Sequence, residues 1–434
     1  MRRLNLLLST PVFYVVSLVA YALARWSASV GHAPAHFPDS LGYEHVHFIG
    51  INERFWAVPL VYSVIHSDAH RVIAQVVIGI CAWAYLAQRI SVITRFRRIS
   101  ISAVLVVGLS PQVIHFDSAI LSESLGISFA VGAVASSLHL SQSPTRLVKI
   151  LWLALVTLTA FTRPTHLILI AAGAIYCGGA YLLSGRKRRK ASALILTALS
   201  LWGFMQLSGN DSVSNLNFYT VLQRRICIED SAYNWFIAHN MPDVSGLCSA
   251  HGYGRATQLD SDIRSIVQLP LEQMPPMSMV AGGVVLAEWV RDHGWSTYAQ
   301  YIATHPTKAI QVIQSKTAKT LSPADETFLP THSSSPIPHQ LFDPWWAWSL
   351  IAIAGLAISW LSRANVRLVR AVTATSVVAL LVFASTILTS AIEYERHGIT
   401  TAVILRVLAL TAVALATGLK GATKPSEADV ARAK

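Results

Sequence analysis

Four short segments of the sequence place acidic and basic side chains beside long apolar stretches, where ionisable groups usually serve a function. They are Pro38-Asp39-Ser40-Leu41-Gly42-Tyr43, Asp117-Ser118-Ala119-Ile120-Leu121-Ser122-Glu123-Ser124-Leu125, Thr162-Arg163-Pro164 and Glu395-Arg396-His397. A carboxylate in a partly dehydrated cleft can take a proton from a hydroxyl. A guanidinium can bind two phosphate oxygens at once. These residue types therefore suit the transfer of a group from a phosphate to a hydroxyl.

Asp39 is the candidate general base, because such a transfer needs a base close to the proton of the acceptor. The alternative is an Asx turn after Pro38, in which the Asp39 side chain hydrogen-bonds its own backbone. Glu44 lies in the same polar segment and is the second candidate for the base.

Asp117 and Glu123 lie on either side of a predicted helix start. Ser122-Glu123 is a good capping pair, because the helix dipole favours a carboxylate at the amino terminus, and capping is one interpretation. The other is that both acids reach one cavity, where they orient the substrates or hold a divalent cation beside a phosphate. We favour positioning of the substrates over a metal site.

Arg163 and Arg396 are the candidates for binding a phosphate, whose growing negative charge must be stabilised as it leaves. In the alternative interpretation, Arg396 pairs with Glu393 or Glu395 at the surface, and the Arg163 side chain extends to water. Arg406 lies deeper in the last apolar stretch, where exposure to lipid is costly. We expect it to face the same cavity and to extend the same anion site.

The composition is that of an all-α polytopic membrane protein. Of the 434 residues, 53% are hydrophobic and only 13% are charged, which is too little polar surface for a soluble globule. Apolar runs near the length that crosses a bilayer, about 20 residues, predict about ten spans. They lie near residues 6–25, 69–88, 99–114, 121–140, 148–161, 165–183, 191–208, 345–361, 371–389 and 400–418.

The distribution of charge orients these spans. Lysines and arginines outnumber acids by 34 to 22, an excess that in a soluble protein would suggest a nucleic-acid partner. Here the basic residues cluster in the segments that an internal amino terminus places in the cytoplasm, such as Arg186–Lys190. Glu427 and Asp429 are the only acids in those cytoplasmic segments. The positive-inside rule therefore explains the charge, and we expect no nucleic-acid partner.

Two predicted spans, the third and the fifth, would rise only roughly 21 to 24 Å at 1.5 Å per residue, less than the ~30 Å hydrocarbon core. The connections after them, His115–Leu121 and Thr162–Thr165, should then lie below the outer surface. Irregular backbone is tolerated there only where it is buried in protein or lines a wet cavity. Asp117, Glu123 and Arg163 lie in or beside these connections, so the sequence predicts an outward-facing cavity with charged walls.

The spans and the two long polar segments between them predict four parts. These are a transmembrane module at 1–208 with an external loop at 30–68, an external domain at 209–344, three further spans at 345–418 and a cytoplasmic tail at 419–434. Within the external domain, two amphipathic helices meet at His305-Pro306. Cys227 and Cys248 also lie there, on the side where a disulfide is permitted, and two free thiols are the alternative.

In their order and positions, the four charged segments resemble motifs of the GT-C superfamily, integral membrane glycosyltransferases that include the aminoarabinose and protein O-mannosyl transferases. Residues 38–43 are similar to the acid-containing, Tyr-bearing segment that opens the first external loop in that superfamily. Residues 117–125 look like its Ser-Glu signature at the start of the fourth span, and Thr162-Arg163-Pro164 matches its Thr-Arg-Pro. Glu395-Arg396-His397 resembles its Glu-Arg-Tyr or Arg-Tyr motif, with His in place of Tyr.

The resemblance covers residues 1–208 and 370–418. It implies a GT-C-like bundle that moves a sugar, with inversion, from a polyprenyl-phosphate donor to a lipid- or glycan-linked acceptor at the external side of a bacterial plasma membrane. A catalytic acid in the first external loop favours Asp39 as the base; the cofactor stays open, and a divalent cation is compatible. The implied roles are catalysis by Asp39 or Glu44, positioning of the substrates by Tyr43, Asp117 and Glu123, and binding of the donor phosphate by Arg163, Arg396, Arg406 and His397.

A transporter or lipid flippase is the main alternative, since it would also need a charged cavity within the membrane. The sequence shows no inverted repeat and no pair of broken helices in two halves, and its acids lie on one side. An acyl- or phospho-transferring membrane enzyme is a further alternative, but no nucleophile motif is visible. We therefore expect a glycosyltransferase.

Overall fold

The computed structural model describes residues 10–46, 48, 54–170, 217–243, 283–322, 331–362, 365–391 and 394–418. Over these residues the chain forms α-helices joined by short 3₁₀ and π turns. Within the same residues, β-type pairing is confined to two isolated bridges, Ala35 with Ala119 and Thr94 with Gly418. For this part of the chain, the prediction of an all-α protein is confirmed.

Six of the described helices are long and apolar enough to cross a membrane. Five of them are α2 (Thr10–Ser29), α4 (Asp68–Ile93), α7 (Glu123–Gln142), α19 (Val366–Thr389) and α21 (Ile399–Ala416). The sixth, His339–Leu361, includes α18 (Trp345–Leu361). Each lies where the sequence predicted a span. The predicted spans at 165–183 and 191–208 fall largely outside the described residues, so the total of about ten stays a prediction.

The third predicted span is short and bent. Its parts are α5 (Arg97–Gly108), α6 (Pro111–Ile114) and the 3₁₀ helix η2 (His115–Ser118). The chain turns by 51° between α5 and the two short helices. Pro111 explains the break, because its ring keeps Ser110 out of the helical conformation, and Ser110 has φ −59° and ψ 150°. The bend places Asp117 of η2 among buried residues.

The fifth predicted span is also short. α8 (Arg146–Ala160) has 15 residues and rises about 22 Å, less than the ~30 Å hydrocarbon core. The connection that follows it is buried, as the sequence predicted, since Thr162, Arg163 and His166 are at most 8% exposed. Both short spans therefore end in chain segments that protein covers.

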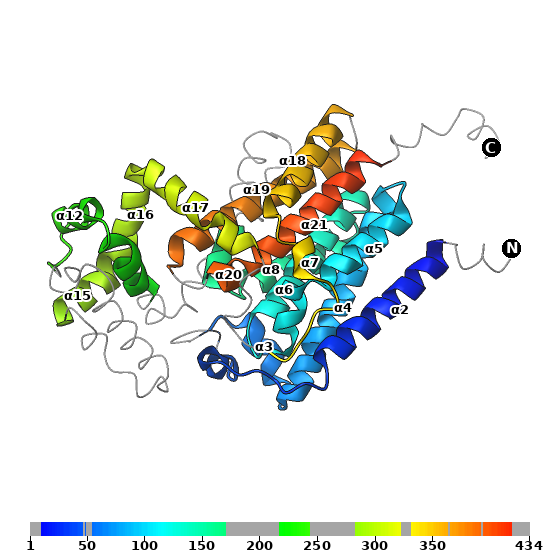
Figure 1. The fold of residues 1–434 in the computed structure, drawn as a ribbon, viewed down its shortest axis with the longest axis horizontal. Helices are drawn as coiled ribbons and strands as arrows, with labels where there is room; N and C mark the ends of the chain where they lie inside the picture. Colours follow the sequence, from blue (N-terminus) through cyan, green and yellow to red (C-terminus); the bar gives the residue numbers. More distant parts are fainter. Residues whose placement is uncertain are drawn as a thin grey trace, which may run out of the picture.

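The two most buried of the described candidate spans are α7 and α21, which run through the middle of the bundle (Figure 1). Along their most apolar stretches, 72% of α7 and 78% of α21 lie inside the protein. α21 packs against α18, α19 and α7, whereas α7 also packs against α4 and α8. Apart from Glu123 and Arg406, both helices carry mostly apolar and small residues around their whole circumference, as expected for a helix that others surround.

α18 comes very close to α21 at Gly355. A Cβ atom added to Gly355 would lie 2.8 Å from the backbone carbonyl carbon of Ala412 in α21. Small residues let the backbones of two membrane helices approach, and close packing is a main source of attraction between such helices. Gly355 therefore determines how tightly α18 packs on the central helix.

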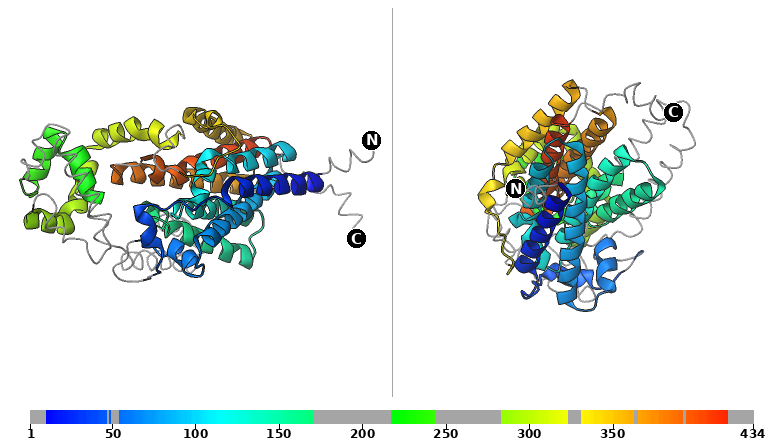
Figure 2. Two further views of the ribbon diagram at one scale, coloured as in Figure 1. Left: turned by 60° about the horizontal axis from the view of Figure 1, so that its bottom comes forward. Right: turned by 90° about the vertical axis from the view of Figure 1, so that its right-hand side faces the viewer.

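A group of short helices lies at one end of the molecule, and we call it the distal module (residues 217–243 and 283–304). Its elements are η4 (Leu222–Ile226), α12 (Asp230–Ala238), α15 (Gly283–Trp289), η7 (Val290–Gly294) and α16 (Trp295–Thr304). They pack around Phe218, Phe236 and Trp289. The start of α2 and the end of α21 lie at the opposite end of the molecule (Figure 1 and Figure 2).

The distal module returns to the bundle through α17 (Pro306–Leu321), which begins two residues after α16 ends at Thr304. The two helices therefore meet at the proline, as predicted. Cys227 of the module is disulfide-bonded. Cys248, its predicted partner, lies outside the described residues.

A buried ion pair joins α2 to η2. Arg25 donates from Nε and Nη2 to the two carboxylate oxygens of Asp117, at 2.7 and 2.8 Å, and neither side chain is exposed. Arg25 also donates to the Tyr21 hydroxyl, and the Ser124 hydroxyl donates to Asp117. Gly79 of α4 makes room for this pair, since a Cβ atom there would lie 2.3 Å from the Arg25 guanidinium.

Replacing Gly355 with Val should push α18 away from α21 and destabilise the protein by about 1–3 kcal/mol, the usual effect of overpacking. Thermal unfolding of the purified protein in detergent measures this change. Ala354→Val is the matched control, because Ala354 is exposed on the same helix. Equal unfolding temperatures for the two variants would contradict the close approach of the helices.

Replacing Asp117 with Leu should leave the Arg25 charge buried without its partner and cost about 3–5 kcal/mol of stability. The double variant Arg25→Met with Asp117→Leu should recover much of that loss, since it leaves no buried charge uncompensated. The same unfolding assay compares the two proteins. A double variant that unfolds below the single one would show that the charges do not stabilise each other.

Candidate functional site

Backbone pairing holds the first connection of the bundle, between α2 and α4, against the bent span. The Ala35 N–H donates to the Ser118 carbonyl at 2.9 Å, and the Ala35 carbonyl accepts from the Ile120 N–H at 3.0 Å. These two bonds fix the chain shortly before Asp39. The position of Asp39 therefore depends on the chain around Asp117.

Asp39 itself lies in the first turn of the 3₁₀ helix η1 (Pro38–Tyr43). Proline suits the start of such a turn, because its fixed φ is already helical. The Phe37 N–H donates to the Ser40 hydroxyl at 2.9 Å. Ser40, rather than Asp39, thus makes the local bond to the backbone, and the Asx turn considered for Asp39 is not the arrangement observed.

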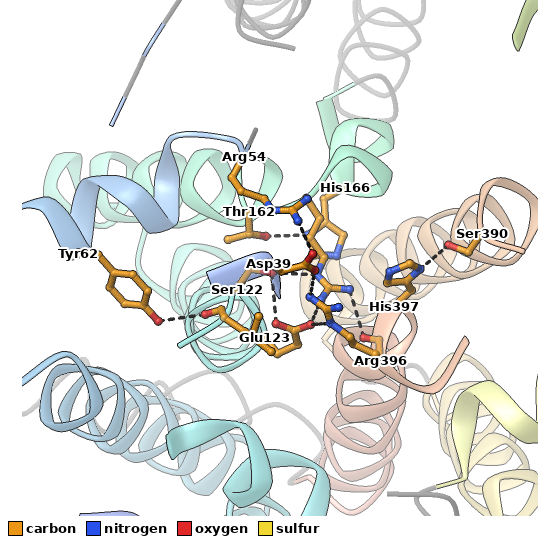
Figure 3. A network of polar contacts seen from close by, with 12 residues as sticks. Asp39, Arg54, Tyr62, Ser122, Glu123, Thr162, His166, Ser390, Arg396 and His397 are labelled. Carbon is orange, nitrogen blue, oxygen red and sulfur yellow. Dashed lines mark hydrogen bonds and ion pairs between the residues drawn. The ribbon is translucent and has the colours of Figure 1, made fainter. Parts of the chain in front are cut away.

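Five charged side chains from four parts of the chain meet beside η1, and we call them the charged cluster (Figure 3). They are Asp39, Arg54, Glu123, Arg163 and Arg396. Glu123 lies in the first turn of α7, Arg163 follows α8, and Arg396 belongs to α20 (Tyr394–His397), just before α21. The cluster therefore joins the early and late halves of the bundle.

Glu123 binds both arginines that the sequence singled out. Its Oε1 atom accepts from Arg396 Nε at 2.5 Å and from Arg163 Nη2. Arg163 also donates to the Arg396 carbonyl at 3.1 Å and to the Ser122 hydroxyl at 3.3 Å. Glu123 is fully buried, and each arginine is 8% exposed. The surface positions considered for these arginines are wrong.

Ser122 and Glu123 do not form the capping pair that was one interpretation of the sequence. Ser122 stands at the position before α7, but its side chain makes no cap bond and instead donates to Glu123 Oε2 at 3.4 Å. Glu395, one of the two surface partners considered for Arg396 in the alternative interpretation, pairs with Lys319 at 3.1 Å. The Glu123 carboxylate therefore binds the two arginines and does not cap the helix.

Asp39 is bound by two arginines on its two sides. Arg396 donates to Oδ2 at 2.5 Å, and Arg54 approaches Oδ1 at 2.6 Å. Burial raises the pKa of Asp39, but the charges of Arg54 and Arg396 outweigh it and hold the pKa well below its ordinary value. Asp39 is therefore an ionised and weak base in this arrangement.

Arg54 was not among the residues that the sequence singled out. Its guanidinium lies over the Tyr43 ring, 5.5 Å from the centroid, as well as beside Asp39. Arg54 is the single Lys or Arg between residues 30 and 68. Its position as the lone cation of an acidic loop could have marked Arg54 as a candidate site residue. The sequence does not reveal, however, which acid it binds.

His397 completes the end of the cluster next to α21. The Ser390 hydroxyl and His397 Nδ1 are hydrogen-bonded at 2.8 Å. Burial and the charges of Arg163 and Arg396 lower the pKa of His397 to about 3, so the imidazole is neutral at ordinary pH. With three guanidiniums against two carboxylates, the charged cluster carries one net positive charge, which favours an anionic ligand.

Two residues expected at this site, Asp117 and Arg406, have different surroundings. Both oxygens of Asp117 bind Arg25, so Asp117 does not join Glu123. Arg406 donates to the side chain of Gln112 and, at 3.2 Å, to the carbonyl of Phe342, rather than joining Arg163 and Arg396. A charged side chain buried at membrane depth needs a partner. The sequence shows that Asp117 and Arg406 need partners, but not which residues those partners are.

The two other residues expected in the first connection lie near Asp39. Tyr43 is buried at the end of η1 and packs edge-on against Tyr62. Glu44 follows it, and its backbone N–H donates to the Leu41 carbonyl at 3.2 Å. Among the described residues, no three His, Cys, Asp or Glu side chains gather in a way that would hold a metal ion.

No protein-family model matches the chain, and no curated protein matches its sequence. Among solved structures, the chain is similar to the archaeal oligosaccharyltransferase AglB from Archaeoglobus fulgidus in complex with an inhibitory peptide and a dolichol-phosphate. The TM-score is 0.42 and the sequence identity is 10%. The similarity covers 97% of this chain and 53% of AglB, so this chain spans about half the length of that protein.

Replacing Arg54 with Gln should raise the pKa of Asp39 toward its ordinary value, because it removes one of the two cations beside the carboxylate. A carboxyl group with a lowered pKa in the folded protein adds stability above its unfolded pKa of about 3.9, and loses that stability as the pH falls below it. Unfolding temperatures of Asp39→Asn against the parent protein, between about pH 3 and 7, measure this contribution.

Asp39 should contribute less to the stability of the folded protein in the Arg54→Gln background than in the wild-type background, at every pH where Asp39 is ionised. Arg291→Gln is the control, since Arg291 is exposed in the distal module and pairs with its neighbour Asp292. Equal contributions in the Arg54→Gln and wild-type backgrounds would show that Arg54 does not stabilise the Asp39 carboxylate.

Proposed function

We propose that this chain is an integral membrane glycosyltransferase that moves a sugar from a polyprenyl-phosphate donor to a hydroxyl acceptor at the outer face of the membrane. The observation that supports this most is the meeting of Arg163, Arg396 and Arg54 with the two acids Asp39 and Glu123. The four motifs that resemble those of GT-C enzymes supply four of the five side chains in this cluster, all except Arg54.

The net positive charge of the cluster suits the donor phosphate. Arg163 and Arg396 present planar guanidinium groups that can bind phosphate oxygens in pairs. Both are largely buried, where hydrogen bonds to a developing charge are stronger than in water. Glu123 sets the direction of both guanidiniums, and neutral His397 and buried Tyr43 help to position the donor and the acceptor.

The proposed step is a single displacement. The acceptor hydroxyl attacks the anomeric carbon of the sugar, and the bond from that carbon to the phosphate oxygen breaks. The hydroxyl proton goes to the Asp39 carboxylate, and the electron pair of the broken bond stays on the phosphate, beside Arg163 and Arg396. Attack from the side opposite the phosphate inverts the configuration of the sugar.

Asp39 must become a stronger base when the donor is bound. In the free protein, Arg54 and Arg396 hold its pKa low. A donor phosphate would draw hydrogen bonds from Arg396 and add negative charge nearby, and both effects raise the pKa of Asp39. The base would thus be activated by the donor that it needs, which limits side reactions of the free enzyme.

Asp117 and Arg406 take supporting roles in this proposal. Asp117 with Arg25 fixes the chain that pairs with Ala35. Arg406 holds the end of α17 and the chain before α18, through the carbonyls of Leu321 and Phe342. Neither is assigned to the substrates. Glu44 is kept as the second candidate for the base.

The test of this function incubates the purified protein, in lipid nanodiscs, with a panel of polyprenyl-phosphate pentoses and hexoses and a cell-envelope glycan extract. Release of polyprenyl phosphate that depends on the acceptor is expected. Asp39→Asn should lower the rate by about 10²-fold or more, the scale for loss of a general base. Arg396→Lys, which keeps the charge but loses the planar fork, should also impair donor use.

Asp292→Asn is the matched control for Asp39, because Asp292 is an exposed acid of the distal module. It should leave the rate unchanged. Near-normal turnover by Asp39→Asn would move the base to Glu44. If no donor is cleaved while an intact substrate crosses a liposome membrane, the protein is a transporter or flippase instead.

A further inference from the structure

Arg225 of the distal module lies in η4 (Leu222–Ile226), a single π-helical turn. Such turns are rare and frequently occur at functional positions. In the described part of the chain, α17 leads from the distal module to the bundle, and side chains of the module also reach α19. Arg225 makes the most of these contacts.

The Arg225 guanidinium donates to five acceptors. Nη1 donates to the Tyr298 hydroxyl at 2.9 Å and to the Leu388 carbonyl at 2.6 Å. Nη2 donates to the carbonyls of Ile387 and Ser390 and to the Tyr394 hydroxyl, the last at 3.0 Å. Tyr298 also donates to the Leu388 carbonyl, at 3.1 Å. One planar cation thus joins two helices of the bundle to the module.

Three of these acceptors are carbonyls at the end of α19, which finishes at Thr389. The last carbonyls of a helix have no partner within the helix, and the helix dipole makes them negative. A cation at this place therefore binds strongly and holds the chain that leaves α19. Lys has three donors on a point charge and cannot match this planar pattern.

The chain held by Arg225 leads directly to the charged cluster. The side chain of Ser390, whose carbonyl Arg225 binds, is hydrogen-bonded to His397 at 2.8 Å. Tyr394, whose hydroxyl Arg225 binds, begins the short helix α20 that carries Arg396. Arg225 therefore contacts both the end of α19 and the first residue of α20, the helix that presents Arg396 and His397.

We propose that Arg225 is a positioning residue of the anion site: it fixes the start of α20 relative to the end of α19 and so sets the direction of the Arg396 guanidinium. The inference rests on the proposed function, since it takes the phosphate of a polyprenyl-phosphate donor as the ligand of Arg396. Through Arg225, the distal module controls the affinity for the donor, although no residue of the module is assigned to the donor itself.

The test measures binding of polyprenyl phosphate to the full-length protein in nanodiscs and the KM and kcat for the donor. Arg225→Lys should weaken binding and raise the KM by about tenfold, with a smaller change in kcat, since Asp39 stays in place. Tyr394→Phe removes one acceptor and keeps the ring, and should weaken binding by a few-fold in the same direction.

The control is Arg291→Lys, an exposed arginine of the same module, which should bind polyprenyl phosphate like the wild type. Unfolding temperatures identify variants that fail to fold. If Arg225→Lys and Tyr394→Phe are folded and bind as tightly as the wild type, Arg225 is only a structural anchor and the inference is overturned. If the wild-type protein itself does not bind polyprenyl phosphate, the proposed function fails, and this inference fails with it.

Discussion

The carboxylate of Glu123 is the interaction on which the site depends. It is fully buried and accepts from both Arg163 and Arg396. A charge cannot be buried without a partner except at a large cost, so the start of α7, the chain after α8 and the chain before α21 must meet here. Asp39 then joins through Arg396. Three arginines thus meet two acids, and the surplus positive charge is what the proposed function assigns to the donor phosphate.

A second buried charge pair, between α2 and the bent span, meets the same need of a buried charge for a partner. Arg25 and Asp117 neutralise each other inside the protein, and Gly79 supplies the space. This pair holds the segment that binds Ala35 and so the connection that carries Asp39. Two buried ionic contacts of similar chemistry thus have different tasks. One has its charges balanced and serves the fold, whereas the other has a surplus positive charge and suits a ligand.

Much of the architecture was predictable because span length is a direct physical constraint. The short third and fifth spans predicted connections at membrane depth, and the four motifs predicted that Glu123, Arg163 and Arg396 face the same end. Partners were not predictable: Asp117 and Arg406 are buried ions whose partners come from distant segments. Arg54 and Arg225 were missed because an arginine in a polar segment is usually solvated, and only the fold shows the acceptors around it.

The order of the charged residues along the chain has a consequence for biosynthesis. Arg396 follows Glu123 by 273 residues, so at about 5–20 residues per second the ribosome delivers it roughly 14 to 55 s later. Arg163 follows Glu123 by only 40 residues, and Arg54 follows Asp39 within the same loop. Each acid thus enters the membrane with an arginine of its own, and the surplus positive charge exists only after the last helix is inserted. Within the charged cluster, each acid therefore has an arginine partner before Arg396 is synthesised.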